Sequence, residues 1–164
     1  MKPTQSFIAL IAVLLTASVA LADPAPDSKE RTVLFVCEHG SVKSLMAASL
    51  FNQIAHERGL AWRGIARGIT PDAAVPPRIV RALGDEGIDV TTFVPQPVTQ
   101  ADIAQAKRAI VISLPPSSLQ EANTRVDRWS DVPDSSNYAA ARSALLQHIE
   151  HLLRDLDASD GVQH

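Results

Sequence analysis

The single cysteine of this chain, Cys37, lies directly before a run of small and polar residues. An unpaired thiolate is a nucleophile, so a thiol beside a bound anion can attack its central atom. Gly40 can take a positive φ and let the backbone approach an anion, and Ser41 is small. Lys43 adds positive charge, and Ser44 offers a hydroxyl. We therefore expect a nucleophilic cysteine in an anion-binding loop; the alternative is a small apolar cysteine followed by an ordinary loop.

The elements on either side of Cys37 are suited to hold such a loop. Residues 32–36 form an apolar run with the length and branching of a buried strand. Residues 45–58 carry apolar side chains on one helical stripe, and Gly59 stands where a helix stop is expected. In open α/β sheets, ligands bind where a strand ends and a helix begins. The N–H groups of such a loop and the helix dipole together favour an anion, and the same field stabilises a thiolate.

The rest of the chain alternates apolar strands with helical stretches. Further strands are predicted at 62–68, 108–113 and 124–129, and further helices at 77–86, 99–106 and 141–156. Alternating strands and helices favour right-handed crossovers and a parallel sheet that is covered on both faces. We predict an α/β fold, a three-layer Rossmann-like arrangement with a four-stranded parallel sheet, with residues 32–36 as a central strand.

Length and charge limit the class of protein. The 164 residues suffice for one domain with a sizeable core. The formal net charge of −3 argues against a nucleic-acid-binding protein, because such proteins need many Lys and Arg contacts to phosphate. An anion site in this chain must therefore be local.

The N-terminal residues resemble a targeting segment rather than part of the domain. Lys2 precedes an apolar run over 7–22 that ends in the small residues Ala-Leu-Ala. We expect a signal peptide over 1–22, cleaved after Ala22, a lead-in over 23–30, the domain over 31–158 and a tail over 159–164. A retained membrane anchor is the alternative. The protein would then be periplasmic or secreted, with no membrane association after cleavage. In such a compartment an unpaired cysteine suggests a reactive thiol or an intermolecular partner.

Other polar and aromatic residues have simpler explanations. His39 either stabilises the thiolate, contacts a substrate or points into solvent. His148 and His151 are three residues apart and are expected on the solvent-exposed face of the last helix rather than in a metal site. The aromatic residues are expected in packing or at the rim of the site, with Tyr138 near its entrance. We predict no metal and no cofactor.

The segment VLFVCEHGSVKSLMAASL resembles the active-site segment of low-molecular-weight protein tyrosine phosphatases and of the arsenate reductases that share their fold. Their pattern is an apolar strand, then Cys, five residues, Arg and Ser. Residues 63–90 are similar to the second strand, turn and second helix of that family, and residues 129–156 are similar to its C-terminal part. The resemblance covers nearly all of the chain after residue 30.

This resemblance implies a role for each matching residue. Cys37 would attack phosphorus and form a cysteinyl-phosphate, and Ser44 would stabilise the thiolate as it leaves. An aspartate from a late loop would protonate the leaving group; Asp134 is our choice and Asp131 the alternative. The substrate would be a phosphomonoester, or the oxyanion phosphate or arsenate. The residues expected to bind the oxyanion are Glu38, His39, Gly40, Ser41 and Val42, with Lys43 as a further catalytic residue.

The sequence also departs from the family pattern. Lys43 stands where the family has Arg, and an ammonium cannot hold two oxygens with a planar fork. Gly40 stands in place of Asn, and Ser135 in place of the Pro after the acid. The resemblance implies a phosphatase, and the apolar N-terminal segment implies that it is exported. The alternatives are an arsenate reductase that uses an external thiol, since the chain has one cysteine, and an oxyanion-binding module with weakened catalysis.

Overall fold

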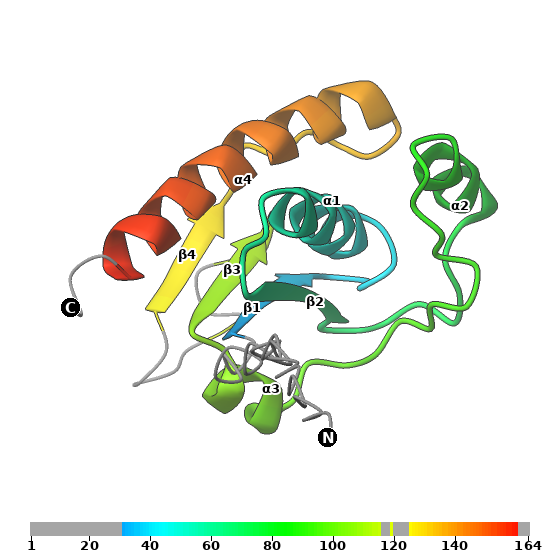
Figure 1. Cartoon of the computed structure of the whole chain (residues 1–164). Helices are drawn as coiled ribbons and strands as arrows, with labels where there is room; N and C mark the ends of the chain where they lie inside the picture. Colours follow the sequence, from blue (N-terminus) through cyan, green and yellow to red (C-terminus); the bar gives the residue numbers. More distant parts are fainter. Residues whose placement is uncertain (1–30, 116–118, 120–124, 161–164) are drawn as a thin grey trace, which may run out of the picture.

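The computed structural model describes residues 31–115, 119 and 125–160 (Figure 1). The elements in chain order are β1 (Arg31–Cys37), α1 (Lys43–Glu57), β2 (Trp62–Gly68), α2 (Pro77–Gly84), α3 (Gln100–Gln105), β3 (Arg108–Ile112), β4 (Arg125–Trp129) and α4 (Tyr138–Asp160). The predicted signal peptide and lead-in lie outside the described residues. The last helix extends to Asp160, two residues beyond the predicted end of the domain.

The strands form one four-stranded parallel sheet in the order β2-β1-β3-β4. Strand β1 lies inside the sheet, where Phe35 pairs with Ala66 of β2 and Ile110 of β3. The predicted sheet, with residues 32–36 as a central strand, is confirmed. The crossovers place Cys37 at the carboxyl end of an inner strand, between two neighbours.

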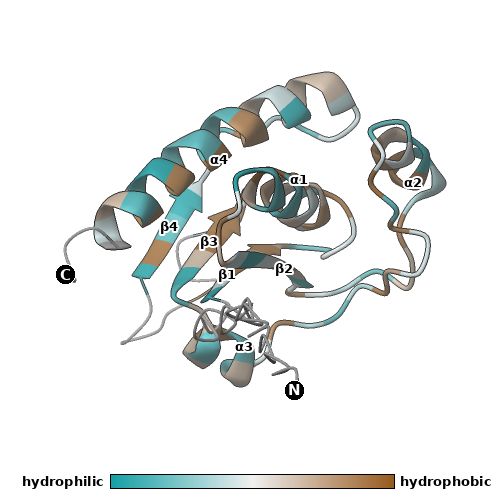
Figure 2. Ribbon diagram, in the orientation of Figure 1, coloured by the Kyte–Doolittle hydropathy of each residue, from teal (hydrophilic) through white to brown (hydrophobic). Residues whose placement is uncertain are grey.

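Both faces of the sheet are covered. Figure 1 shows α1 and α4 on one face and α3 on the other. Because side chains alternate along a strand, Val33 and Phe35 of β1 join the core beneath α1 and α4, whereas Leu34 and Val36 join the smaller core with α3. All four of these side chains have no exposed surface, and Figure 2 shows hydrophobic residues along the inner strands β1 and β3. The prediction of helices on both faces is confirmed.

The helix boundaries differ slightly from the prediction. Helix α1 begins at Lys43 rather than at the predicted residue 45. The apolar stripe does not reveal this start, because the first two residues of the helix are polar and precede the stripe. Gly59 and Gly87 have φ of 65° and 79°, as expected after the ends of α1 and α2. Thr99 caps α3: its hydroxyl accepts from the Asp102 N–H at 3.1 Å, and the carboxylate of Asp102 accepts from the Thr99 N–H at 3.0 Å.

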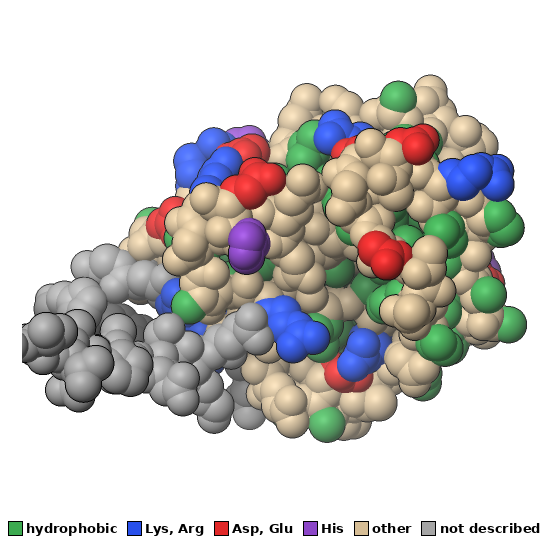
Figure 3. Space-filling model, turned by 45° about the vertical axis from the view of Figure 1, so that its right-hand side comes forward, with side chains coloured by type: hydrophobic (Ala, Val, Ile, Leu, Met, Phe, Trp, Pro, Cys, Tyr) green, Lys and Arg blue, Asp and Glu red, His purple; other side chains and the backbone are tan. Residues whose placement is uncertain are grey.

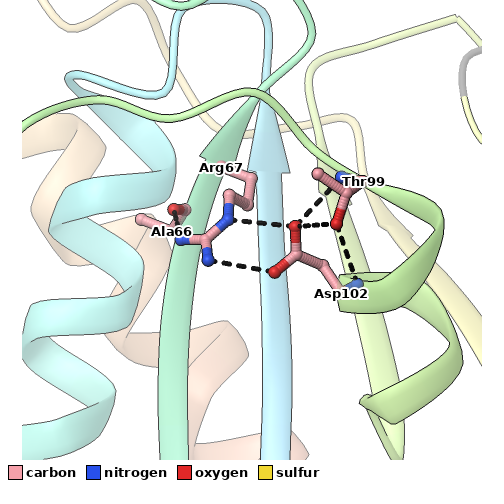
Figure 4. A network of polar contacts seen from close by, with 4 residues as sticks. All are labelled: Ala66, Arg67, Thr99 and Asp102. Carbon is pink, nitrogen blue, oxygen red and sulfur yellow. Dashed lines mark hydrogen bonds and ion pairs between the residues drawn. The ribbon is translucent and has the colours of Figure 1, made fainter.

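A polar network joins α3 to β2 (Figure 4). The guanidinium of Arg67 donates to both carboxylate oxygens of Asp102, at 3.1 and 2.9 Å, and to the carbonyl of Ala66 at 3.0 Å. Burial raises the pKa of Asp102, but the hydrogen bonds from Thr99 and Arg67 together outweigh this effect and lower it. The network thus joins the first turn of α3 to the carboxyl end of β2.

Strand β2 is an edge strand, and side chains and loops occupy much of its edge. Asn52 of α1 accepts from the Gly64 N–H at 2.6 Å and donates to its carbonyl at 3.0 Å, as a neighbouring strand would. Gly68 donates to the carbonyl of Gln96 and accepts from the Val98 N–H, both at 2.9 Å. These contacts satisfy the backbone groups of Gly64 and Gly68 with which an added strand would otherwise pair. Among the helices that the structure describes, none has both the length and the apolar character of a membrane span.

Candidate active site

The end of β1, the loop over 38–42 and the start of α1 form the predicted strand-loop-helix unit. Cys37 is the last residue of β1 and is 5% exposed. Val42 is the N-cap residue of α1; its apolar side chain makes no capping hydrogen bond, and the first turn contains no acidic residue. The start of this 15-residue helix therefore lacks the polar N-cap side chain that usually accepts from its first N–H groups. This helix end favours a negative charge beside Cys37.

Ser44 contacts the thiol twice. Its hydroxyl oxygen lies 3.1 Å from the Cys37 sulfur, and its backbone N–H donates to that sulfur at 3.4 Å. The Ser44 side chain is completely buried. A hydroxyl and an N–H therefore lie within hydrogen-bond distance of one sulfur. The structure therefore brings together the two residues that the sequence predicts as nucleophile and as its stabilising hydroxyl.

Two glycines let the loop lie against the end of β2. Gly40 has φ of 67°, and a Cβ at this position would lie 2.8 Å from the backbone nitrogen of Gly68. A Cβ on Gly68 would in turn lie 2.8 Å from the nitrogen of Gly40. From the sequence, Gly40 is explained by a positive φ and by the approach of the backbone to an anion. The structure adds a stronger reason, because no side chain fits there while Gly68 keeps its place.

Asp72, in the segment after β2, holds the loop from outside. Its carboxylate accepts a hydrogen bond from the buried hydroxyl of Ser41, and its N–H donates to the carbonyl of His39 at 3.0 Å. The other carboxylate oxygen lies 3.5 Å from Nδ1 of His39, whose side chain is 60% exposed. Glu38 is also exposed, and its carbonyl accepts from the Thr70 N–H at 2.8 Å. The loop is thus fixed mainly through its backbone and Ser41.

Lys43, the first residue of α1, reaches across to two other segments. Its Nζ donates to the hydroxyl of Ser113, just after β3, at 2.9 Å and to the carbonyl of Val132 at 3.2 Å. Ser113 has φ of 53°, and its hydroxyl lies 3.3 Å from the same carbonyl. The ammonium is therefore held between the carboxyl end of β3 and the loop that carries Asp134.

The two candidate acids have different surroundings. Asp134 is exposed, and the Ser136 N–H donates to its carboxylate at 2.8 Å. That hydrogen bond is the main reason that its pKa lies below the ordinary value, and the charge of Lys43 acts in the same direction. Asp131 instead accepts from His148 of α4 at 2.7 Å, which is also the main cause of its lowered pKa. Asp134 is thus bonded within its own loop and subject to the charge of Lys43, whereas Asp131 contacts helix α4.

The remaining candidates lie in other contacts. His148 stacks on Trp129 with ring centroids 4.7 Å apart, and His151 contacts Arg154 at 2.8 Å. The part of the chain that the structure describes contains no group of three or more His, Cys, Asp or Glu side chains that could hold a metal ion. The hydroxyl of Tyr138 donates to Glu86 at 2.6 Å; burial, and then this hydrogen bond, raise the pKa of Tyr138.

A cavity of about 780 Å³ lies apart from these residues, along the outer edge of β2. It is lined by α1, β2 and residues 87–94, and none of the predicted site residues lines it. On the face shown in Figure 3, Lys and Arg side chains lie in separate small groups, several of them beside Asp or Glu. The charge pattern of that face is mixed.

Sequence reasoning missed two residues of the site. Asp72 and Ser113 come from segments that the chain brings to Cys37 only through the parallel sheet, since both follow strands that flank β1. Their place after predicted strands is the one available signal, because ligand sites in such sheets collect residues from several strand ends.

The fold and this loop define an α/β protein whose cysteine lies at the end of an inner parallel strand, beside a helix start whose dipole favours an anion. The family model described as low molecular weight phosphotyrosine protein phosphatase matches residues 32–131. The chain belongs to this family, whose members are cysteine-based phosphatases and arsenate reductases.

Solved structures share the fold at low identity. The chain is similar to YfkJ from Bacillus subtilis, with a TM-score of 0.71, 20% identity and coverage of 81% of this chain and 98% of that one. A low molecular weight protein tyrosine phosphatase from T. tengcongensis matches with a TM-score of 0.65, 23% identity and coverage of 76% and 99%.

A thioredoxin-dependent arsenate reductase from Corynebacterium glutamicum matches with a TM-score of 0.68, 19% identity and coverage of 81% of this chain. The match spans 65% of that reductase, which is less than two thirds of its length. No curated protein sequence matches the chain.

Proposed function

We propose that this protein is an exported phosphomonoesterase that works through a cysteinyl-phosphate on Cys37. The observation that carries the proposal is the pair of contacts from Ser44 to the Cys37 sulfur, at 3.1 and 3.4 Å, at the uncapped start of α1. The nucleophilic sulfur and the N–H groups that would hold the oxyanion then lie at the same helix start. The apolar run over 7–22, which ends in small residues, supports export.

The first half of the reaction transfers the phosphoryl group to sulfur. The Cys37 thiolate attacks phosphorus while the loop N–H groups and Lys43 hold the three non-bridging oxygens. The bond from phosphorus to the ester oxygen breaks, and its electron pair stays on that oxygen. Asp134, when protonated, gives its proton to this oxygen, so the products are an alcohol and a cysteinyl-phosphate.

The second half returns the enzyme to its starting state. Asp134, now a carboxylate, takes a proton from water as the water attacks phosphorus. The bond from sulfur to phosphorus breaks, inorganic phosphate leaves, and the thiolate re-forms beside the Ser44 hydroxyl. Asp134 is preferred to Asp131 because the charge of Lys43 acts on Asp134, whereas Asp131 is engaged by His148.

The test is hydrolysis of an aryl phosphate by the purified protein, followed by acid quenching and mass spectrometry. We expect turnover without added metal and a trapped phosphoryl group on Cys37. Cys37→Ser should abolish both signals. Ser44→Ala should slow thiolate departure and raise the trapped fraction. Turnover that persists in Cys37→Ser would exclude the proposed nucleophile.

Arsenate reduction is the second candidate, and the Cys37 thiolate beside an oxyanion site also favours it. The chain holds one cysteine, so a cysteinyl-arsenate would need an external thiol. That thiol would attack the sulfur of Cys37, reducing arsenic to arsenite and leaving a mixed disulfide. Arsenite production that depends on an added small thiol, without phosphatase turnover, would favour this function.

A binding module is the third candidate, and the engagement of Lys43 by two neutral oxygens favours it. Anion binding at Cys37 with neither phosphatase nor reductase turnover would identify it.

A further inference from the structure

Lys43 has a flexible side chain whose ammonium is held by two hydrogen bonds. An ammonium is a compact charge on a four-carbon chain, with three N–H donors and no planar fork. Here two donors are engaged, at 2.9 Å by the Ser113 hydroxyl and at 3.2 Å by the Val132 carbonyl. Both acceptors are neutral, so neither cancels the positive charge. The third N–H remains for an oxyanion at the start of α1.

Ser113 has a backbone conformation that its side chain does not favour. Among the residues that the structure describes, it is the single non-glycine residue with a positive φ. Its N–H donates to the Trp129 carbonyl at 3.0 Å, which extends the pairing of β3 with β4 by one residue and fixes this conformation. Glycine would adopt the same φ without strain. A serine here contributes what glycine lacks, a hydroxyl directed at Lys43.

The Ser113 hydroxyl also connects Lys43 to the loop of the candidate acid. It donates to the Val132 carbonyl at 3.3 Å, so the lysine, the serine and this carbonyl form a closed triangle of contacts. The hydroxyl proton is directed to the carbonyl, which leaves the oxygen lone pairs for the ammonium. The direction of each hydrogen bond around Lys43 is therefore set.

We propose that Ser113 is a positioning residue that holds the Lys43 ammonium for an oxyanion bound over Cys37. Lysine and serine together then replace the single guanidinium at this place in the family pattern. This inference rests on the proposed oxyanion site. A purely structural role, in which the contacts only join α1 to β3, is the opposing explanation.

Two substitutions at Ser113 separate these roles, because both tolerate a positive φ. Ser113→Gly removes the acceptor and the backbone strain, whereas Ser113→Asn keeps a side-chain acceptor. Each is measured on the full chain by thermal unfolding and by the phosphate concentration that protects Cys37 from iodoacetamide. Lys43→Met, alone and combined with Ser113→Gly, completes a double-mutant cycle.

We expect Ser113→Gly to unfold at the same temperature or higher, yet to need about fivefold to tenfold more phosphate for protection. Ser113→Asn should lie closer to the unaltered protein. With Met at position 43, Ser113→Gly should cause no further loss. Equal protection of Ser113→Gly and the unaltered protein, or an equal loss with and without Lys43, would overturn the proposal while leaving the oxyanion site intact. If phosphate and arsenate fail to protect even the unaltered protein, the proposed function fails and this inference with it.

Discussion

At the scale of single residues, the site depends on where charges and protons lie around one sulfur. Ser44 places its hydroxyl and its N–H at the Cys37 sulfur, and Lys43 adds an ammonium that donates to two neutral oxygens. Asp134 adds a carboxylate whose pKa is lowered by the Ser136 N–H and then by Lys43. These few groups decide how fast phosphate can be transferred and at which pH.

Lys43→Arg tests whether the ammonium at position 43 limits the rate of turnover. A planar guanidinium matches two equatorial oxygens of the transition state, so we expect turnover of an aryl phosphate to rise by up to about 100-fold. Phosphate affinity should change little, because the charge is unchanged. Steady-state kinetics and phosphate inhibition measure the two effects separately.

Lys107→Arg is the matched control for Lys43→Arg. Lys107 is exposed and precedes β3, at the opposite end of the sheet from Cys37. A rise in turnover in this variant would show that the effect does not come from the site. Unchanged turnover in Lys43→Arg, with phosphate still bound, would mean that another step limits the reaction.

The lowered pKa of Asp134 predicts the pH dependence of turnover. A carboxyl with a pKa below its ordinary value of 3.8 is largely ionised above about pH 5, so the protonated acid is scarce near neutral pH. We expect turnover of an alkyl phosphate, whose leaving group needs the proton, to rise as the pH falls from 7 toward 4. The rise should be smaller for an aryl phosphate with a stable phenolate. Asp134→Asn should abolish the rise that is seen with the alkyl phosphate.

Asp131→Asn is the control for the choice of acid. Because Asp131 contacts His148 on α4, its substitution should leave the ratio of alkyl to aryl turnover unchanged. The opposite pattern, with Asp131→Asn abolishing the rise and Asp134→Asn sparing it, would reverse the assignment of the acid.

At the scale of elements, the short parallel sheet is held together by apolar packing and by a few charged contacts at its faces. The Arg67 and Asp102 pair joins β2 to α3, with side chains that are 25% and 13% exposed. A partly buried, bidentate pair that also closes a helix cap contributes more than an exposed ion pair. Helix α3 has only six residues, so its attachment relies on such contacts.

Asp102→Asn is expected to lower the free energy of unfolding by about 2 kcal/mol at pH 7. A depressed pKa in the folded state gives stability that is present above the unfolded pKa, near 3.8, and is lost as the pH falls through the folded value. The difference between the variant and the unaltered protein should therefore be constant from pH 7 to about pH 5 and shrink below pH 4. Urea unfolding at several pH values measures it.

Asp157→Asn, an exposed carboxylate on α4, is the matched control and should change stability little at any pH. If the effect of Asp102→Asn is as large at pH 3 as at pH 7, the ionised carboxylate is not its source.

Apolar patterns were sufficient to predict the elements, but not every contact among them. The inner strands are short apolar runs, and β2 was predicted with its observed limits. The polar start of α1 contains no apolar stripe, so its first turn was placed too late. The partners Asp72 and Ser113 lie 35 and 76 residues after Cys37, and only the order of strands in the folded sheet brings them to it. Spacing along the chain carries no information about such contacts.

At the scale of the whole molecule, export remains a prediction from residues 1–22. If a signal peptidase cleaves after Ala22, intact-mass measurement on protein from the producing cell should find a chain that begins at Asp23. Ala20→Asp together with Ala22→Asp should block cleavage, because the peptidase needs small side chains there. A full-length chain that starts at Met1 and is released with the cytosol would contradict the prediction.

The contact between Gly40 and Gly68 has a consequence for how this molecule can change over generations. Either glycine blocks a side chain on the other, so a mutation at one position is harmful until the end of β2 has moved. The order of mutations therefore matters: a lineage that acquires Asn at position 40 must first displace the backbone at Gly68. Of the two departures from the family pattern in this loop, Lys43 is coupled to its neighbours through hydrogen bonds of a flexible side chain, whereas Gly40 is restricted by a backbone contact that no change of rotamer relieves.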